Sequence, residues 1–252
     1  MKVSLPMYIV LLCTVWLFYP EFTACSKDSI WCSVAYWATE SAGRIGTPVI
    51  ILITSFVFAI YAQSLKAKAK TFFKTFIVFS IVLSTFAFLN EHLIKSTLQV
   101  ARPSHTYIIR QTKSLARLDS LYTLPVTERR KFFQGLIDGD TISFRDTDAR
   151  VLSHWIEEAG YSFPSGHSFN AFLLGSILAF SIYYMANRNL RWLYILPMTW
   201  AVLVAVSRVA IGAHSALDVS IGGALGILVS HTLLYFSVTQ ALLTHQRHAE
   251  RG

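Results

Sequence analysis

The sequence predicts an all-α fold, a polytopic membrane bundle of six transmembrane helices with one small helical subdomain outside the membrane. Of its 252 residues, 54% are hydrophobic and only 14% are charged, well below the roughly 25% of soluble domains. The mean hydropathy is positive. The apolar residues form six runs, and one long polar stretch separates the third run from the fourth. We therefore expect a single domain, residues 1–252, with residues 96–163 as a subdomain within it.

The six spans are predicted from apolar runs of near-membrane length, at about residues 3–19, 45–62, 71–89, 168–186, 192–212 and 218–238. A membrane-crossing helix needs roughly 17 to 25 residues, so the second run is short. We expect the first run to be a retained helix and not a signal peptide, because Phe22-Thr23-Ala24-Cys25 is a poor cleavage site. Pro197, inside the fifth run, predicts a kink. Between the first two spans, Trp31, Tyr36 and Trp37 stand at helical spacing and predict an interfacial helix.

Lysine-rich and arginine-rich loops orient the chain across the membrane. Lys66, Lys68 and Lys70 follow the second span, and Arg188 and Arg191 follow the fourth. Short loops rich in these residues are typical of the cytoplasmic side. Both chain ends then lie in the cytoplasm, and the polar stretch lies on the opposite, outer side. The net charge of +8 forms no continuous patch, so we exclude a nucleic-acid partner.

The polar stretch, residues 96–163, carries nearly as many acidic as basic residues. The rule that positively charged loops stay in the cytoplasm holds for short loops and not for long ones. This stretch can therefore lie outside the cytoplasm. Its apolar residues follow a helical rhythm, which predicts short helices that cover the outer end of the bundle. These residues are Leu136, Ile137, Val151, Trp155 and Ile156.

Three cysteines are too few for a disulfide scaffold. Cys13 lies within the first span. Cys25 and Cys32 follow it on the predicted outer side, where thiols can oxidise. The sequence leaves open whether these two residues form a disulfide or stay as thiols.

Three basic residues stand at the predicted outer ends of the spans. Lys95 and Arg102 are seven residues apart, so they share a face if the segment is helical, and Pro103 indicates that the helix ends there. Taken alone, these two residues would be ordinary interfacial anchors. Arg208 changes this interpretation, because an arginine within a span is costly and marks a functional site. Its planar fork suits phosphate oxygens, so we expect the three cations to bind a phosphate.

A turn of sequence Pro164-Ser165-Gly166-His167 precedes the fourth span. Ser165 is a good N-cap residue, and the amides of Ser165, Gly166 and His167 would then face an anion at the helix start. Gly166 permits a close approach of the backbone to that anion. His167 is placed to donate a proton to a leaving oxygen. The turn alone is also compatible with a plain helix cap and a surface histidine.

His214 and Asp218 stand four residues apart at the start of the sixth span, where their side chains can meet. Asp218 can accept a hydrogen bond from one ring nitrogen of His214. The other nitrogen is then unprotonated and can act as a nucleophile. A carboxylate in the first helical turn also interacts favourably with the helix dipole, which is the structural alternative for Asp218.

Together these residues predict phosphoryl transfer by in-line displacement. His214 attacks phosphorus, and His167 protonates the departing oxygen and then activates a water molecule. Three cations and two amides hold the phosphate oxygens and stabilise the charge of the transition state. They belong to Lys95, Arg102, Arg208, Ser165 and Gly166. No cluster of carboxylates accompanies them, so we predict that no metal ion and no cofactor is needed.

The three motifs resemble those of the type 2 phosphatidic acid phosphatase superfamily, in its integral-membrane branch. They are K-x6-R-P from Lys95, P-S-G-H from Pro164 and S-R-x5-H-x3-D from Ser207, and all their positions are filled. Within this family the chain is similar to a bacterial type that acts on phosphatidylglycerophosphate. That likeness rests on the length, the six spans, the segment 121–124 and the runs 153–155 and 160–163.

The resemblance implies a membrane lipid phosphatase that forms phosphatidylglycerol and also acts on undecaprenyl diphosphate, phosphatidic acid, lysophosphatidic acid and diacylglycerol diphosphate. It implies a bacterial inner membrane, with the subdomain and the site facing the periplasm. The substrates are phospholipids and polyprenyl phosphates, and we expect no obligate protein partner. The alternatives are an undecaprenyl-diphosphate phosphatase for carrier recycling, a non-enzymatic lipid transporter and a vanadate-dependent peroxidase. The named residues bind phosphate and not the lipid tail, so they do not separate the two phosphatases.

Overall fold

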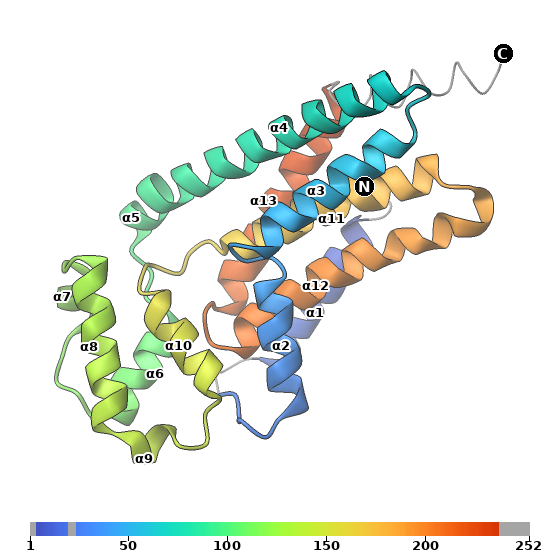
Figure 1. Ribbon diagram of the computed structural model, residues 1–252. Coiled ribbons are helices and arrows are strands. Elements are labelled where there is room, and N and C mark those ends of the chain that lie inside the picture. The colour runs from blue at the N-terminus through green and yellow to red at the C-terminus, as the bar shows by residue number, and fades with distance from the viewer. Residues whose placement is uncertain (1–3, 20–23, 237–252) are drawn as a thin grey trace.

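The computed structural model describes residues 4–19 and 24–236 (Figure 1). Within these ranges the regular elements are helices, and one isolated β-bridge joins Ser26 to Thr147. The predicted all-α class is confirmed. The long helices are α4 (Leu65–Leu89), α11 (Gly166–Met185), α12 (Ile195–Ala210) and α13 (Ala216–Tyr235), and the shorter apolar helices α1 (Ser4–Phe18) and α3 (Gly46–Ile60) pack beside them.

Among the described residues, four segments are long and apolar enough to cross a membrane. They are Leu65–Leu98, Gly166–Met185, Arg188–Ala210 and Ala216–Tyr235, and they correspond to the third to sixth predicted spans. Helices α1 and α3 have 15 residues each, about 22 Å of helix against a hydrocarbon core of about 30 Å. The first two of the six predicted spans therefore stay a prediction.

Helix α11 is the central helix of the bundle. It packs against α12 and α13, and α3 lies against it as well (Figure 1). A Cβ atom on Gly222 of α13 would lie 2.3 Å from the carbonyl oxygen of Ser165, and one on Gly226 would lie 2.5 Å from that of Phe169. Glycines four residues apart permit two helix backbones to pack this closely in a membrane. The contact holds the N-terminal ends of α11 and α13, and the motifs they carry, next to each other.

The structure corrects the predicted lysine-rich loop before α4. Ser64 caps a helix that already begins at Leu65, and its hydroxyl accepts a hydrogen bond from the amide of Ala67 at 3.2 Å. Lys66, Lys68 and Lys70 are therefore helical. Lysine and alanine alternate here and both are good helix formers, so the helix continues through the basic segment and the loop shortens to residues 61–64.

Pro197 lies near the start of its α-helix. Residues Arg188–Tyr194 form a 3₁₀ helix, and α12 begins directly after it at Ile195. Pro197 thus lies in the first turn of α12. A proline is well tolerated near the start of an α-helix, and the kink at Pro197 stays a prediction.

The polar stretch folds into short helices at one end of the bundle, as predicted (Figure 1). They are α6 (Pro103–Gln111), α7 (Leu118–Tyr122), α8 (Val126–Gly139), α9 (Thr141–Phe144) and α10 (Ala149–Glu157). Their shared core includes Ile137, Val151 and Trp155, which are buried, and Leu136 and Ile156 pack partly buried against it. We call this group the loop subdomain.

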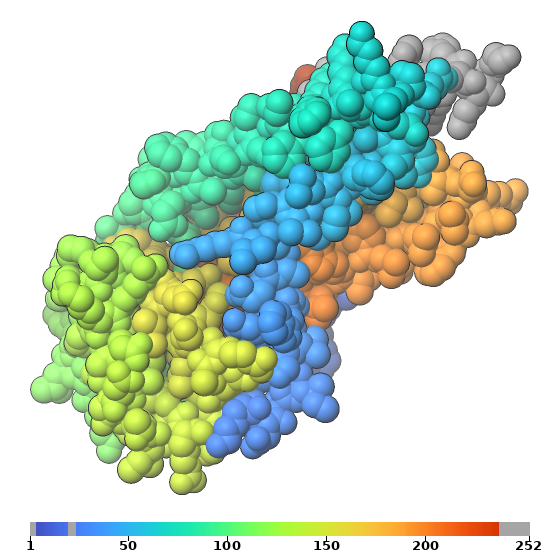
Figure 2. All heavy atoms as spheres, viewed as in Figure 1, coloured from blue at the N-terminus to red at the C-terminus, as the bar shows by residue number. Residues whose placement is uncertain are grey.

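Helix α2 (Ile30–Glu40) forms between the first two apolar helices, as the aromatic spacing predicts, and packs along α12. Cys25 and Cys32 form a disulfide, which answers the point that the sequence leaves open. The Arg150 guanidinium of α10 donates to the Ser33 hydroxyl at 2.8 Å. Figure 2 shows α2, in blue, beside the green and yellow atoms of the loop subdomain, so this segment connects the subdomain to the bundle.

Candidate active site

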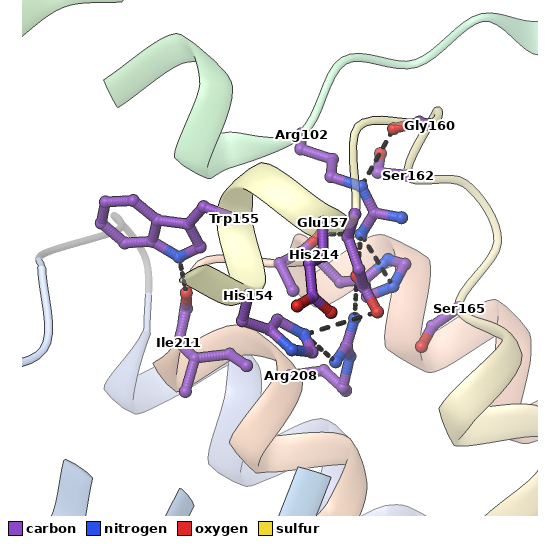
Figure 3. Close-up of polar contacts among 12 residues, drawn as sticks. Arg102, His154, Trp155, Glu157, Gly160, Ser162, Ser165, Arg208, Ile211 and His214 are labelled. Atoms are coloured by element: carbon purple, nitrogen blue, oxygen red, sulfur yellow. Dashed lines mark hydrogen bonds and ion pairs between the residues drawn. The ribbon is translucent and has the colours of Figure 1, made fainter. Parts of the chain in front are cut away.

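The three motifs converge where the loop subdomain meets the ends of α11, α12 and α13. Arg102 comes from the extended link before α6, Arg208 from the last turn of α12, and His214 from the loop before α13. Figure 3 shows these side chains together, with His154 of α10 beside Arg208. Arg102, Arg208 and His214 are each at most 4% exposed. Two buried guanidinium groups require an anionic partner.

His214 lies in a loop that Gly212, with a φ of 72°, turns back toward the subdomain. The ring nitrogen Nε2 of His214 lies 3.4 Å from Nη1 of Arg102. A guanidinium only donates hydrogen bonds, so this contact makes Nε2 the acceptor and leaves the proton on Nδ1. Burial lowers the pKa of the His214 imidazole to about 3; Asp218 opposes this shift and Arg102 adds to it. The ring is therefore uncharged at neutral pH, as a nucleophile must be.

Asp218 makes both of the contacts predicted for it, one at the start of the helix and one with His214. Its Oδ2 accepts a hydrogen bond from the Ser215 amide at 2.8 Å, and its own amide donates to the Ser215 hydroxyl at 3.2 Å. This capping box starts α13. The same Oδ2 lies 3.4 Å from Nδ1 of His214, a contact that is not aligned as a hydrogen bond in this structure. Asp218 thus caps the helix and also faces the protonated side of the imidazole.

Ser165 is the N-cap of α11, as predicted, and its hydroxyl accepts from the Ser168 amide at 3.3 Å. Its own amide donates to the Asp218 carbonyl at 3.0 Å. This occupied amide corrects the expectation that the Ser165 N–H binds phosphate. A Cβ atom on Gly166 would meet nothing closer than Asn90 Nδ2, at 3.7 Å. The packing of the protein therefore does not require glycine there.

His167 lies in the first turn of α11 and is partly buried. Its Nε2 faces Gly43, where an added Cβ atom would come within 3.5 Å. The charges of Arg208, Glu158 and His214 act on the His167 ring, so it belongs to the same cluster. Within the described part of the chain the ring has no hydrogen-bond or ion-pair partner. Both ring nitrogens are therefore available for proton transfer.

The cluster contains an acid that the sequence analysis does not single out, Glu158. Its Oε2 lies 2.7 Å from Nη1 of Arg102 and is hydrogen-bonded to Nη2 of Arg208, and its Oε1 lies 3.4 Å from Nε2 of His154. Burial alone would raise the pKa of the Glu158 carboxyl, but Arg208 and Arg102 hold it well below its usual value. Glu158 is thus the anion that both guanidinium groups surround.

His154 is the second residue that the sequence analysis misses. Its Nε2 lies 2.8 Å from Nη1 of Arg208, and its Nδ1 lies 3.6 Å from Oε1 of Glu40 on α2. His154 and Glu158 are four residues apart at the end of α10, directly before the Gly160 link to α11. An acid and a histidine at helical spacing, so close to the turn at residues 164–167, are the signal that could have identified both residues.

Arg102 is fixed by backbone carbonyls from two loops. Its Nε donates to Gly160 at 2.9 Å, its Nη1 to Ala213 at 2.8 Å and its Nη2 to Tyr161 at 3.3 Å. Its amide donates to the Tyr122 hydroxyl at 3.2 Å. The guanidinium therefore joins the loop before α11 to the loop that holds the His214 ring.

Lys95 and Arg102 lie on different segments, although the charge of Arg102 still acts on the Lys95 ammonium. The helix of Lys95, α5 (Lys95–Leu98), ends because Gln99 adopts a left-handed φ of 50°, and Arg102 is extended. The condition for a shared helical face, one continuous helix from Lys95 to Arg102, is therefore not met. The Lys95 ammonium lies 2.9 Å from Oε2 of Glu91. Each of the three predicted cations thus has a carboxylate partner.

The donor set of the site suits an anion. Within the ranges that the structure describes, no group of three or more His, Cys, Asp or Glu side chains is arranged to hold a metal ion. The arginines Arg102 and Arg208 point their N–H groups at one carboxylate, and a phosphate presents the same oxygen pattern. An anion at the position of the Glu158 carboxylate would lie next to the acceptor nitrogen of His214.

Comparison with known proteins agrees with this geometry. A family model described as the PAP2 superfamily matches residues 73–241, which include all three motifs. The chain is 35% identical over 94 residues to phosphatidylglycerophosphatase B of Bacillus subtilis, covering 32% of this chain and 46% of the relative. It is 28% identical over 151 residues to that of Haemophilus influenzae (59% and 60%) and 26% identical over 182 residues to that of Escherichia coli (71% and 66%). The chain thus spans about half to two thirds of the length of these curated relatives.

Proposed function

Because the chain belongs to the PAP2 superfamily, we propose that it is a membrane lipid phosphatase that hydrolyses phosphatidylglycerophosphate to phosphatidylglycerol and phosphate. One observation carries the proposal. Nη1 of Arg102 contacts both the carboxylate of Glu158, at 2.7 Å, and Nε2 of His214, at 3.4 Å. An anion held by this arginine is therefore within reach of an uncharged imidazole that can attack it.

The first half of the proposed reaction forms a phosphohistidine. Nε2 of His214 attacks phosphorus, the bond to the lipid oxygen breaks, and protonated His167 gives its proton to that oxygen. Asp218 stabilises the positive charge that the His214 ring gains. In the second half, neutral His167 takes a proton from a water molecule. The oxygen of that water attacks phosphorus, the bond between phosphorus and Nε2 of His214 breaks, and phosphate is released.

The proposed phosphate site uses the three cations in place of a metal ion. Arg102 and Arg208 bind the phosphate oxygens through their N–H groups, and Lys95 adds a third positive charge. The outward amides of Gly166 and His167, at the start of α11, supply further donors with the helix dipole behind them. Ser165 keeps this helix start in place through its cap. Charge that builds up on the transferring group is then met by fixed donors.

The substrate and the setting are further parts of the proposal. The relatives are named for phosphatidylglycerophosphate, and we extend the proposed activity to undecaprenyl diphosphate, phosphatidic acid and diacylglycerol diphosphate, which carry the same terminal phosphate. We place the chain in a bacterial inner membrane, with six spans and the site facing the periplasm. The long apolar helices support a membrane setting.

Phosphate release by the purified protein in detergent with EDTA tests this proposal. Wild type and His214→Ala are assayed side by side on phosphatidylglycerophosphate and undecaprenyl diphosphate. We expect release by the wild type alone, and the ratio of the two rates separates the phosphatidylglycerol role from carrier recycling. A silent wild type, activity that returns only with added metal, or an equally active mutant would contradict the proposal. Lipid movement without turnover in both proteins would instead indicate the transporter.

A further inference from the structure

We propose that the Glu158 carboxylate stands in the place of the substrate phosphate and must leave it when a lipid binds, so that Glu158 weakens the binding of inorganic phosphate, the product. The inference rests on the proposed function, because it concerns the same two arginines. It adds a specificity-determining residue that belongs to none of the three sequence motifs.

The contacts of Glu158 reproduce those expected of a phosphate. One oxygen accepts from both Arg102 and Arg208, and the other faces His154 at 3.4 Å. Arginine forks bind carboxylate and phosphate with the same geometry. Two anions side by side between the same guanidinium groups would repel each other strongly at this burial. Phosphate and the Glu158 carboxylate therefore exclude each other.

Glu158 is also the residue of the cluster whose side chain can move from the arginines into solvent. Its side chain is 21% exposed, against 5% for Arg102, 0% for Arg208 and 2% for His214. It is the C-cap of α10, with non-helical backbone angles, and the link to Gly160 follows. The side chain can therefore turn toward solvent without unwinding a helix, whereas the arginines stay in place.

Exchange between the two anions affects lipid and product differently. A lipid phosphate gains additional binding energy from its apolar chains, because their burial is favourable. Inorganic phosphate has only its charge to displace Glu158. The carboxylate therefore returns after hydrolysis and expels the product, and the site keeps its preference for phosphate that is attached to a lipid.

The test compares the dissociation constant of inorganic phosphate, measured by calorimetry in detergent, between wild type and Glu158→Gln. Glutamine keeps the size of the side chain and removes the charge. If the wild-type site is open to phosphate about a tenth of the time, the substitution tightens phosphate binding about tenfold. Unchanged or weaker binding would show that Glu158 supports the phosphate site and does not compete with phosphate.

Glu40→Gln is the matched control. Glu40 faces His154 at 3.6 Å, so Glu40→Gln also removes one negative charge beside the cluster but frees neither arginine. We expect little change in phosphate affinity. An equal gain in both variants would attribute the effect to general electrostatics and overturn the proposal. Should Glu158→Gln fail to fold, Glu158→Asp, which is one methylene shorter, replaces it and should tighten phosphate binding by a smaller factor; an unchanged constant in Glu158→Asp counts against the proposal.

Phosphate binding needs no turnover, so the two hypotheses fail separately. Tighter phosphate binding in Glu158→Gln together with a wild type that hydrolyses no lipid would refute the proposed function. It would still support competition between the Glu158 carboxylate and phosphate. Lipid hydrolysis by the wild type together with an unchanged phosphate constant in Glu158→Gln would refute only the competition.

Discussion

Nη1 of Arg102 lies 3.4 Å from Nε2 of His214. Because the guanidinium can only donate, the lone pair of Nε2 faces the arginine that we propose to bind the phosphate, and the protonated Nδ1 faces Asp218. This contact thus sets the tautomer of the ring and the side on which its proton lies.

Asp218→Asn should lower kcat by about 1000-fold or more, because an amide no longer stabilises the positive ring and can favour the wrong tautomer. Asparagine can still accept the Ser215 amide, so the capping contact at 2.8 Å is preserved. Ser215→Ala is the control, since it removes the capping hydroxyl and costs about 1 kcal/mol of stability without touching the His214 pair. Equal losses of kcat in the two variants would mean that Asp218 acts only as a cap.

Gly222→Ala should separate the two helix starts that carry the motifs. Its Cβ atom would lie 2.3 Å from the Ser165 carbonyl oxygen, so α13 must shift, at a cost of about 1–3 kcal/mol of stability. Turnover should fall by more than the fraction of protein that unfolds. Gly135→Ala is the control, because no atom lies within 4 Å of its Cβ position in α8, and it should stabilise the protein slightly. Thermal unfolding and turnover are measured together. Normal activity of Gly222→Ala would mean that the close approach is not needed.

His105 should make the protein less stable in acid. Burial lowers the pKa of its imidazole to about 3, and its ring contacts the Tyr122 hydroxyl at 2.7 Å and the Trp155 carbonyl at 3.2 Å. Between pH 6.5 and 3 the unfolded chain binds a proton here and the folded protein does not. Stability is therefore greatest above pH 6.5 and falls with decreasing pH, by up to about 1.4 kcal/mol per pH unit.

His105→Gln checks this slope through the free energy of unfolding at several pH values. The variant should be less stable at neutral pH but depend less on pH between 6.5 and 4. His214 contributes a slope of the same sign, so some dependence should persist. An unaltered slope would show that His105 is not kept neutral by the fold.

The Cys25–Cys32 disulfide should stabilise the segment that joins the bundle to the loop subdomain. Replacing Cys32 by serine, or adding reductant, should cost roughly 2 kcal/mol, as expected for a short closed loop. Cys13→Ser is the control, because Cys13 is an exposed free thiol. The unfolding temperature of each protein is measured with and without reductant. A wild type whose unfolding temperature does not change with reductant would argue against a stabilising disulfide.

The residue types of the site could be predicted from sequence because each motif lies on one short segment. The i,i+4 spacing of His214 and Asp218 and the N-cap position of Ser165 depend only on a helix beginning where the sequence predicts one. The burial of Val151 and Trp155 follows from the helical rhythm of α10 in the same way. In these cases local spacing alone decides which groups meet.

The contacts between segments could not be predicted in this way. Glu157 and Glu158 are neighbours in sequence, yet only the rotation of α10 against α12 decides that Glu158 meets Arg208 while Glu157 stays exposed. The amide of Ser165 pairs with Asp218 because Gly222 lets α13 approach α11 closely. The left-handed Gln99 ends the helix of Lys95 before Arg102 is reached, and its conformation carries no clear sequence signal.

The most direct test of the phosphohistidine account is to trap the intermediate. The purified protein is mixed with phosphatidylglycerophosphate labelled in its terminal phosphate and quenched in alkali, in which phosphohistidine is stable. We predict a protein-bound label that is lost in acid and is absent from His214→Ala. A wild type that releases phosphate without ever carrying label, or a His214→Ala protein that carries as much label as the wild type, would contradict the assignment of His214 as the nucleophile.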